Sequence, residues 1–160
     1  MTKIRPVPPT LRKLAISLLN HTVVELFDLF VCIKHADWNV RGASFIGLHR
    51  FLAEFAWRIL DYMDVAAEQA ISLGGTVEGA VRAGSKHLPL KQSDVPHPIG
   101  GISYWLQELA KVNATYSEHA RAAAGKMTEA GEPGTADLLT AIARDLAQPF
   151  WMLEAHMDQQ

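Results

Sequence analysis

The sequence predicts an all-α fold, a four-helix bundle made of two helical hairpins joined by one long crossover. Apolar residues recur every three or four positions in four long runs, without the every-second-residue alternation of a half-buried strand. A Gly- and Pro-containing segment from about residue 76 to residue 98 separates the second run from the third, and it is longer than most bundle loops. At 160 residues the chain has room for one domain of ordinary size.

The first predicted helix runs from about residue 10 to residue 38. Residues 1–9 include three prolines, which fix φ and lack a backbone donor, so we expect an extended tail there. Thr10 is the expected N-cap, because its hydroxyl can accept a hydrogen bond from a first-turn N–H.

The second predicted helix, from about residue 45 to residue 73, is apolar nearly all round. Ser44 is its expected cap, and the Gly74–Gly75 pair should end it. Its large apolar residues are Phe51, Leu52, Phe55, Trp57, Ile59, Leu60, Tyr62 and Met63. Since a helix with one buried face would keep a polar side, we expect this helix to pack against its own bundle and against a second subunit.

Two further apolar runs predict the second hairpin. One begins at Ile102 and ends near Gly125, and the other has Thr135 as its expected N-cap. Pro149 lies inside the last run and should kink it, because it removes a backbone hydrogen bond. With one short helix expected in the crossover, the predicted bundle domain covers residues 10–158.

Composition and charge exclude several classes of protein. The net charge of −2 gives no general attraction to nucleic acid or to an anionic membrane. Cys32 is the only cysteine, which excludes an intrachain disulfide and a zinc–cysteine cluster and suggests a small core residue. There is no signal-peptide pattern and no uncharged run near the roughly 20 residues that span a bilayer, so we expect a cytoplasmic protein.

Asp64 and Glu68 lie four residues apart on the second predicted helix, hence on one of its faces. Such pairs repel each other and usually mark a solvated face, but on a helix apolar nearly all round they need a cation or a positive partner. His49 is a third candidate ligand, but it lies roughly 22 Å from Asp64 along one helix. One chain therefore cannot bring these groups together.

An antiparallel pair of second helices would join them. With a two-fold axis near Trp57, His49 of each chain faces Asp64 and Glu68 of the other, which gives two equivalent sites per dimer. An imidazole with carboxylates suits iron or zinc better than magnesium or calcium. The alternative is a hydrogen-bonded interface histidine with Asp64 paired to an Arg or Lys, and spacing alone does not separate the two interpretations.

Three separated motifs resemble the Dps-type mini-ferritins, the DNA-binding proteins from starved cells. They are DWNVRGASFIGLH, DVAAEQAISLGG and TADLLTAIARDLAQPFWMLEAH, and the resemblance covers residues from about 10 to 157. It implies a ferritin-like subunit assembled into a hollow dodecamer. It also implies Fe(II) oxidation by hydrogen peroxide or oxygen, storage of ferric mineral, relief of oxidative stress and, in many members, DNA binding at the nucleoid.

The resemblance assigns His49, Asp64 and Glu68 to the family's ligand histidine, aspartate and bridging glutamate. Trp38 matches the tryptophan beside the iron centre, where it can intercept radicals, although it could equally fill the corner under the turn. Asp37 stands where most members have a ligand histidine, and it can still donate an oxygen.

Ala53 stands four residues after His49, where the family commonly has an aspartate ligand. Glu54 is adjacent but points about 100° away on a helix. Three outcomes stay open: one tightly held metal, a substitute ligand, or weak ferroxidase activity. His35 and His156 are spare imidazoles.

Glu132 and Asp137 match acidic residues that line the family's iron pore, although a solvated turn and compensation of the helix dipole also explain them. Lys3 and Arg5 in the tail are the candidate DNA contacts, but so few cations favour weak or absent DNA binding. The leading prediction is an iron-storing ferroxidase. The alternatives are a non-enzymatic shell acting in DNA compaction or passive metal binding, and a structural zinc site.

Overall fold

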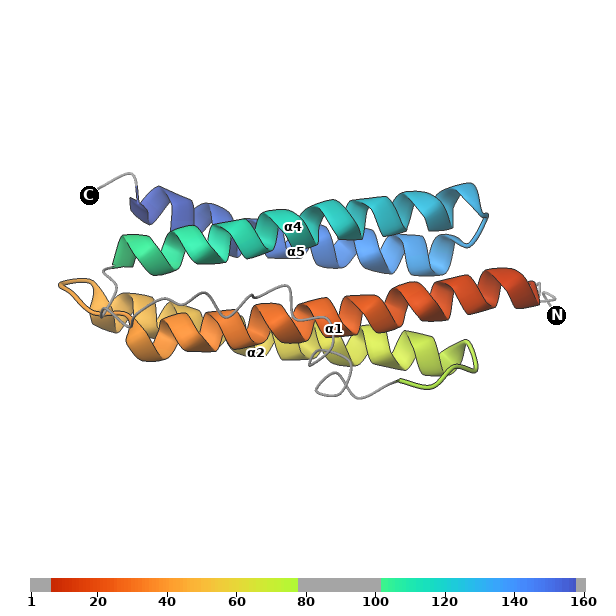
Figure 1. The fold of residues 1–160 in the computed structure, drawn as a ribbon, viewed down its shortest axis with the longest axis horizontal. Helices are drawn as coiled ribbons and strands as arrows, with labels where there is room; N and C mark the ends of the chain where they lie inside the picture. Colours follow the sequence, from red (N-terminus) through yellow and green to blue (C-terminus); the bar gives the residue numbers. More distant parts are fainter. Residues whose placement is uncertain (1–6, 78–101, 158–160) are drawn as a thin grey trace, which may run out of the picture.

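The computed structural model describes residues 7–77 and 102–157. This part of the chain forms four helices and no strand: α1 (Pro9–Asn39), α2 (Phe45–Ser72), α4 (Ile102–Glu129) and α5 (Pro133–Met157). Figure 1 shows α1 and α2 as one antiparallel hairpin and α4 and α5 as the other. The predicted bundle is confirmed, whereas the expected crossover helix and most of the tail lie outside the described residues.

One apolar core joins the two hairpins. Its central side chains, each at most 1% exposed, are Leu19, Leu26, Leu52, Ile59, Leu106, Leu109, Ile142 and Leu146. Each helix contributes two of them, and full burial of such a side chain stabilises the fold by about 1.5–3 kcal/mol. The packing of these residues fixes the relative positions of the helices that carry the candidate site.

By length and composition α1 could cross a membrane, although the sequence offers no uncharged run of that length. Its apolar face packs inward, with Leu29 and Ile33 fully buried, and it also buries Asp28 and Asp37. Core helices of soluble bundles have the same length and composition. Packing in the bundle therefore accounts for the apolar character of α1.

None of the three predicted side-chain caps forms. Helix α1 begins on a proline one residue before Thr10, where the missing proline N–H is no loss, and Ser44 occupies the N-cap position of α2 without a side-chain hydrogen bond. Helix α5 begins at Pro133, and the backbone N–H of Thr135 donates to Glu132 Oε2 at 2.8 Å. Glu132 therefore does the capping that was expected of Thr135.

The turn of the second hairpin is shorter than predicted, because α4 ends later and α5 begins earlier than the sequence suggested. Helix α4 continues past Gly125 to Glu129, and Gly131 follows with a φ of 78°. Glycine adopts such a positive φ without steric cost, which suits the residue that closes a helix. Helix α5 continues through Pro149 to Met157, so the proline does not end it.

Helix α2 has apolar residues on both sides, as predicted. Leu52, Phe55 and Ile59 face the core and are at most 2% exposed. Three residues on its outer side, Ile46, Trp57 and Ile71, are 66%, 70% and 55% exposed. An exposed apolar face of this kind is typical of a protein–protein contact.

Asp28 of α1 is buried, and its Oδ1 has no hydrogen-bond partner. Burial and, second, the charge of Glu25 one turn away raise the pKa of Asp28 to about 6. The folded chain therefore holds this proton more tightly than the unfolded chain. The resulting contribution to stability is present below the ordinary pKa of about 4 and is lost as pH rises through about 6.

We expect Asp28→Asn to stabilise the metal-free protein above pH 6, by on the order of 1 kcal/mol, and to change little below about pH 4. The pH dependence of the urea unfolding midpoint measures this effect. Asp61→Asn, at an exposed position of α2, is the control and should leave the midpoint unchanged. An equal gain for Asp28→Asn at both pH values would indicate a packing effect instead.

Candidate metal centre

The corner between α1 and α2 is fixed by its backbone. Gly42 has a φ of 124°, a conformation that glycine adopts readily. Arg41 Nη1 donates to the carbonyl oxygens of Trp38 and Val40 at 3.1 and 2.7 Å. Val40 is fully buried, and its N–H donates to the carbonyl of Ala36. The last turn of α1 is thereby held beside the first turn of α2.

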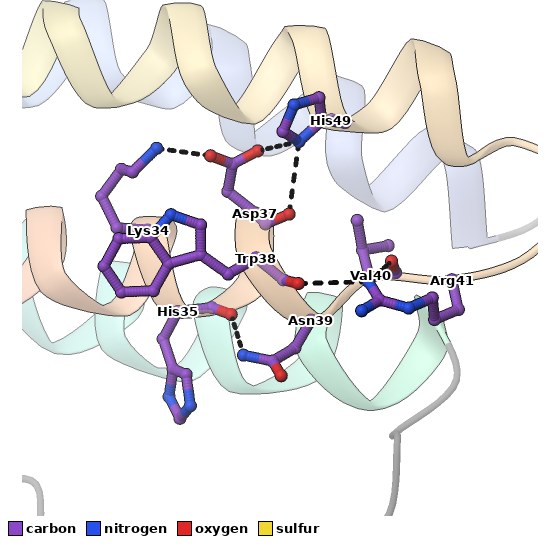
Figure 2. Close-up of polar contacts among 8 residues, drawn as sticks. All are labelled: Lys34, His35, Asp37, Trp38, Asn39, Val40, Arg41 and His49. Carbon is purple, nitrogen blue, oxygen red and sulfur yellow. Dashed lines mark hydrogen bonds and ion pairs between the residues drawn. The ribbon is translucent and has the colours of Figure 1, made fainter.

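Asp37 and His49 meet across this corner (Figure 2). His49 Nδ1 lies 2.5 Å from Asp37 Oδ1 and 3.3 Å from the Asp37 carbonyl oxygen. The Asp37 side chain is 1% exposed and that of His49 is 46% exposed. Phe45 stacks on the imidazole with ring centroids 5.4 Å apart. The imidazole is thus oriented on one face by an aromatic ring and at Nδ1 by a buried carboxylate.

Lys34 belongs to the same cluster, and sequence reasoning missed it. Its Nζ lies 2.5 Å from Asp37 Oδ2 and 5.5 Å from the ring centroid of Trp38. The three-residue spacing of a lysine and an aspartate on one helix was the available signal. A metal ion at Asp37 has to compete with this ammonium group.

The donors at this corner suit an iron ion. Asp37 Oδ1 is buried and, despite the nearby imidazole, receives no well-aligned hydrogen bond. A buried carboxylate oxygen in that state is costly unless charge compensates it. Iron accepts both imidazole nitrogen and carboxylate oxygen as ligands. Asp37 and His49 are therefore chemically suitable donors for an iron ion.

Asp64 and Glu68, the other two predicted ligands, are both exposed on α2. In the part of the chain that the structure describes, the single group of three close metal-ligand side chains lies elsewhere and includes none of the four. The single chain therefore pairs Asp37 with His49 but does not bring the carboxylates of Asp64 and Glu68 to them. This agrees with the expected separation of roughly 22 Å along α2.

Comparison with known proteins identifies the family. The Ferritin-like domain model matches residues 16–160. A DNA protection during starvation protein from Agrobacterium fabrum is 34% identical over 154 residues, which cover 96% of this chain and 94% of the relative. The chain is a Dps-type mini-ferritin.

Solved Dps structures share the fold over nearly the whole chain. The tetragonal form of Mycobacterium smegmatis Dps has a TM-score of 0.85 at 26% identity, covering 98% of this chain and 94% of that one. The high iron form of Dps from Microbacterium arborescens has a TM-score of 0.84 at 25% identity, covering 94% and 97%.

Three aromatic or imidazole side chains of this mini-ferritin differ in their surroundings. Trp38 is 64% exposed and so does not fill the corner in the single chain. His35 packs edge-on against Trp105, with ring centroids 4.7 Å apart. His156 lines a separate pocket of about 320 Å³ with Phe51 and other residues. Neither spare histidine joins the Asp37–His49 pair.

Ala53 is partly buried one turn after His49, and Glu54 beside it is exposed. No other carboxylate of the described residues contacts His49 in place of the missing aspartate. No substitute for the missing aspartate therefore contacts His49 in this part of the chain.

Cys32 lies partly in the core, and burial raises the pKa of its thiol to about 12, which makes it inert.

The acidic pore candidates have different surroundings. Glu132 is 7% exposed, and its carboxylate is engaged at the start of α5, whereas Asp137 is exposed. Lys3 and Arg5, the candidate DNA contacts, lie outside the described residues.

Proposed function

We propose that this mini-ferritin oxidises Fe(II) with hydrogen peroxide or oxygen and stores the ferric product inside a cytoplasmic dodecamer. Asp37 and His49 of one subunit bind iron together with Asp64 and Glu68 of the partner subunit. The observation that carries this proposal is the pairing of the buried Asp37 carboxylate with His49. Asp37 Oδ1 lies beside His49 Nδ1 but receives no well-aligned hydrogen bond, so it remains free to bind a cation. Removal of Fe(II) and peroxide together limits oxidative damage.

The outer face of α2 supports the shared arrangement. Trp57 lies midway between His49 and the Asp64–Glu68 pair, and it is 70% exposed. Two antiparallel copies of α2 that cross near this residue cover each other's apolar faces. The same pairing removes Asp64 and Glu68 from solvent. Two neighbouring carboxylates that are buried in an interface need a cation to compensate their charge.

The electron balance makes the number of irons decisive. Reduction of hydrogen peroxide to two waters takes two electrons and two protons as the O–O bond breaks, and each Fe(II) supplies one electron. A single iron transfers one electron and leaves hydroxide and a hydroxyl radical. Trp38 follows Asp37 in the chain and is exposed, so its indole can supply the second electron: the hydroxyl radical is then reduced to water and the indole is oxidised in place of other targets.

We expect one tightly bound iron per site. Ala53 offers no ligand, and the Lys34 ammonium at Asp37 Oδ2 repels a second cation. Anaerobic titration with Fe(II), followed by peroxide, measures the stoichiometry through the ferric absorbance. Saturation near one iron per chain is the expected result, and the absence of saturable binding would overturn the ferroxidase proposal.

Ala53→Asp should raise the iron count from one towards two per site. The new carboxylate lies one turn after His49 on the same face of α2. Oxidation by peroxide should become faster by roughly tenfold or more, because both electrons then come from one site. Ala53→Asn, similar in shape but neutral, is the control, and an unchanged iron count in Ala53→Asp would contradict this assignment.

Ala53 and Lys34 also favour a second candidate function, a shell that holds metal without oxidising it. Zinc can occupy the same ligands but has no redox chemistry. Protection of DNA is a separate activity, for which gel retardation at low and moderate salt, with and without residues 1–9, is the test. Retention that does not change on removal of the tail would exclude Lys3 and Arg5 as the contacts.

A further inference from the structure

A second group of metal-ligand side chains lies between α1 and α4, which run side by side in Figure 1. His21 and Glu25 are one turn apart on α1, and His119 comes from α4. His21 Nε2 lies 3.3 Å from Glu25 Oε1, and His119 Nδ1 contacts the same oxygen. One ligand atom from each residue lies within 4.8 Å of the other two.

The three side chains are arranged around an open pocket of about 170 Å³. The Glu25 side chain is 16% exposed, whereas those of His21 and His119 are 61% and 50% exposed. The carboxylate therefore lies deeper than the two imidazoles. Ala122 and Ala123 also line the pocket, and their small side chains leave room for an ion and a water molecule.

Two buried polar groups near Glu25 lack partners. They are Asp28 Oδ1 and the Tyr116 hydroxyl, which belong to α1 and α4. Burial, followed by the charge of Glu25, raises the pKa of both groups. Among the described residues, the ion-pair partners of Glu25 are the two histidines, which are charged only when protonated. Lys126 also lines the pocket but forms no ion pair with Glu25, so a cation bound at the cluster would compensate the charge of this carboxylate.

We propose that His21, Glu25 and His119 bind one divalent first-row transition metal ion per chain, at a site separate from the Asp37–His49 centre. Two imidazoles and one carboxylate are the donors of zinc sites that keep an open fourth position, and of non-haem Fe(II) sites. Zinc is the tighter-binding of these two ions at such donors.

The geometry needs little adjustment to accept the ion. With metal–ligand distances of about 2.0–2.1 Å, ligand atoms around a tetrahedral metal lie roughly 3.4 Å apart. The three atoms lie within 4.8 Å already, so rotation of exposed side chains is enough. Water from the open side of the pocket takes the fourth position.

The test counts zinc on the full-length His49→Ala protein, in which the proposed iron centre is disabled. After equilibrium dialysis against low-micromolar Zn²⁺, we expect about one bound ion per chain. Adding His21→Ala, Glu25→Gln or His119→Ala should remove it, with an affinity loss of about 100-fold or more, because loss of a ligand costs at least as much as loss of a group that supports one. Co²⁺ should give visible absorbance in the parent that each added substitution abolishes.

His35→Ala is the matched control, because His35 is also exposed on α1 and faces α4 through Trp105. It should retain the ion. Absence of zinc from the His49→Ala parent, or equal zinc in all variants, would overturn the proposal. Because the readout is zinc on a protein without His49, failure of the iron proposal leaves this result unchanged.

Discussion

Iron oxidation should disappear in His49→Ala and in Glu68→Ala and should return when the two variants are mixed. Each substitution removes a ligand from both sites of its own dimer. In a mixed dimer one site keeps both residues intact, and the other site loses both. Random pairing makes half of the dimers mixed, so about a quarter of all sites should recover.

The measurement is the initial rate of ferric absorbance after peroxide is added to Fe(II)-loaded protein, with the mixture unfolded and refolded together. Each single variant should lose about 100-fold or more of the rate, a typical effect of damage to a metal site. Glu54→Ala, an exposed carboxylate of α2 outside the ligand set, should keep it. Mixed particles of normal mass without recovered activity would contradict a site shared between subunits.

Trp57→Glu should dissociate the assembly and abolish iron binding in one step. A buried tryptophan covers about 150–250 Å². Trp57 is 70% exposed in the single chain, so burying that exposed part at about 25 cal/mol per Å² contributes on the order of 3 kcal/mol for each of the two copies near the axis. The substitution also places two carboxylates against each other across the axis. The loss for the dimer is therefore on the order of 5 kcal/mol or more, enough to separate most interfaces of moderate size.

Light scattering reports the particle mass, and anaerobic Fe(II) titration reports the site. Trp151→Glu is the comparison, because Trp151 of α5 is 62% exposed but leaves the α2 face intact. It should not abolish iron binding. A Trp57→Glu particle of unchanged mass with full iron binding would rule out the antiparallel α2 contact.

Apolar periodicity was enough to predict the four helices, because each buries a stripe along most of its length. The helix starts were harder to predict. Thr10 and Thr135 look like N-caps in the sequence, but α1 and α5 begin at prolines, and Glu132 accepts the first-turn hydrogen bond of α5. Cap choice depends on which first-turn N–H groups are left without a partner. That depends on the path of the preceding chain, which periodicity does not determine.

Spacing on one helix was enough to propose Asp64, Glu68 and the need for a partner subunit. It did not predict that Asp37 is fully enclosed between Lys34 and His49, because that contact forms across a corner. The second cluster was missed for a similar reason. His21 and Glu25 are visible at a four-residue spacing, but His119 lies 94 residues from Glu25. Only the packing of α1 on α4 brings them together.

The Asp37–His49 pair and the Asp64–Glu68 pair lie far apart on one subunit, and this separation links the supply of iron to the stability of the proposed shell. In the proposed arrangement an iron ion binds only where two subunits meet, so it stabilises the paired state by mass action. At a free concentration 100 times its dissociation constant, each ion adds about 2.7 kcal/mol, and each dimer has two sites. Subunit exchange should therefore slow as Fe(II) accumulates, because the bound iron itself stabilises the contacts between subunits of the shell.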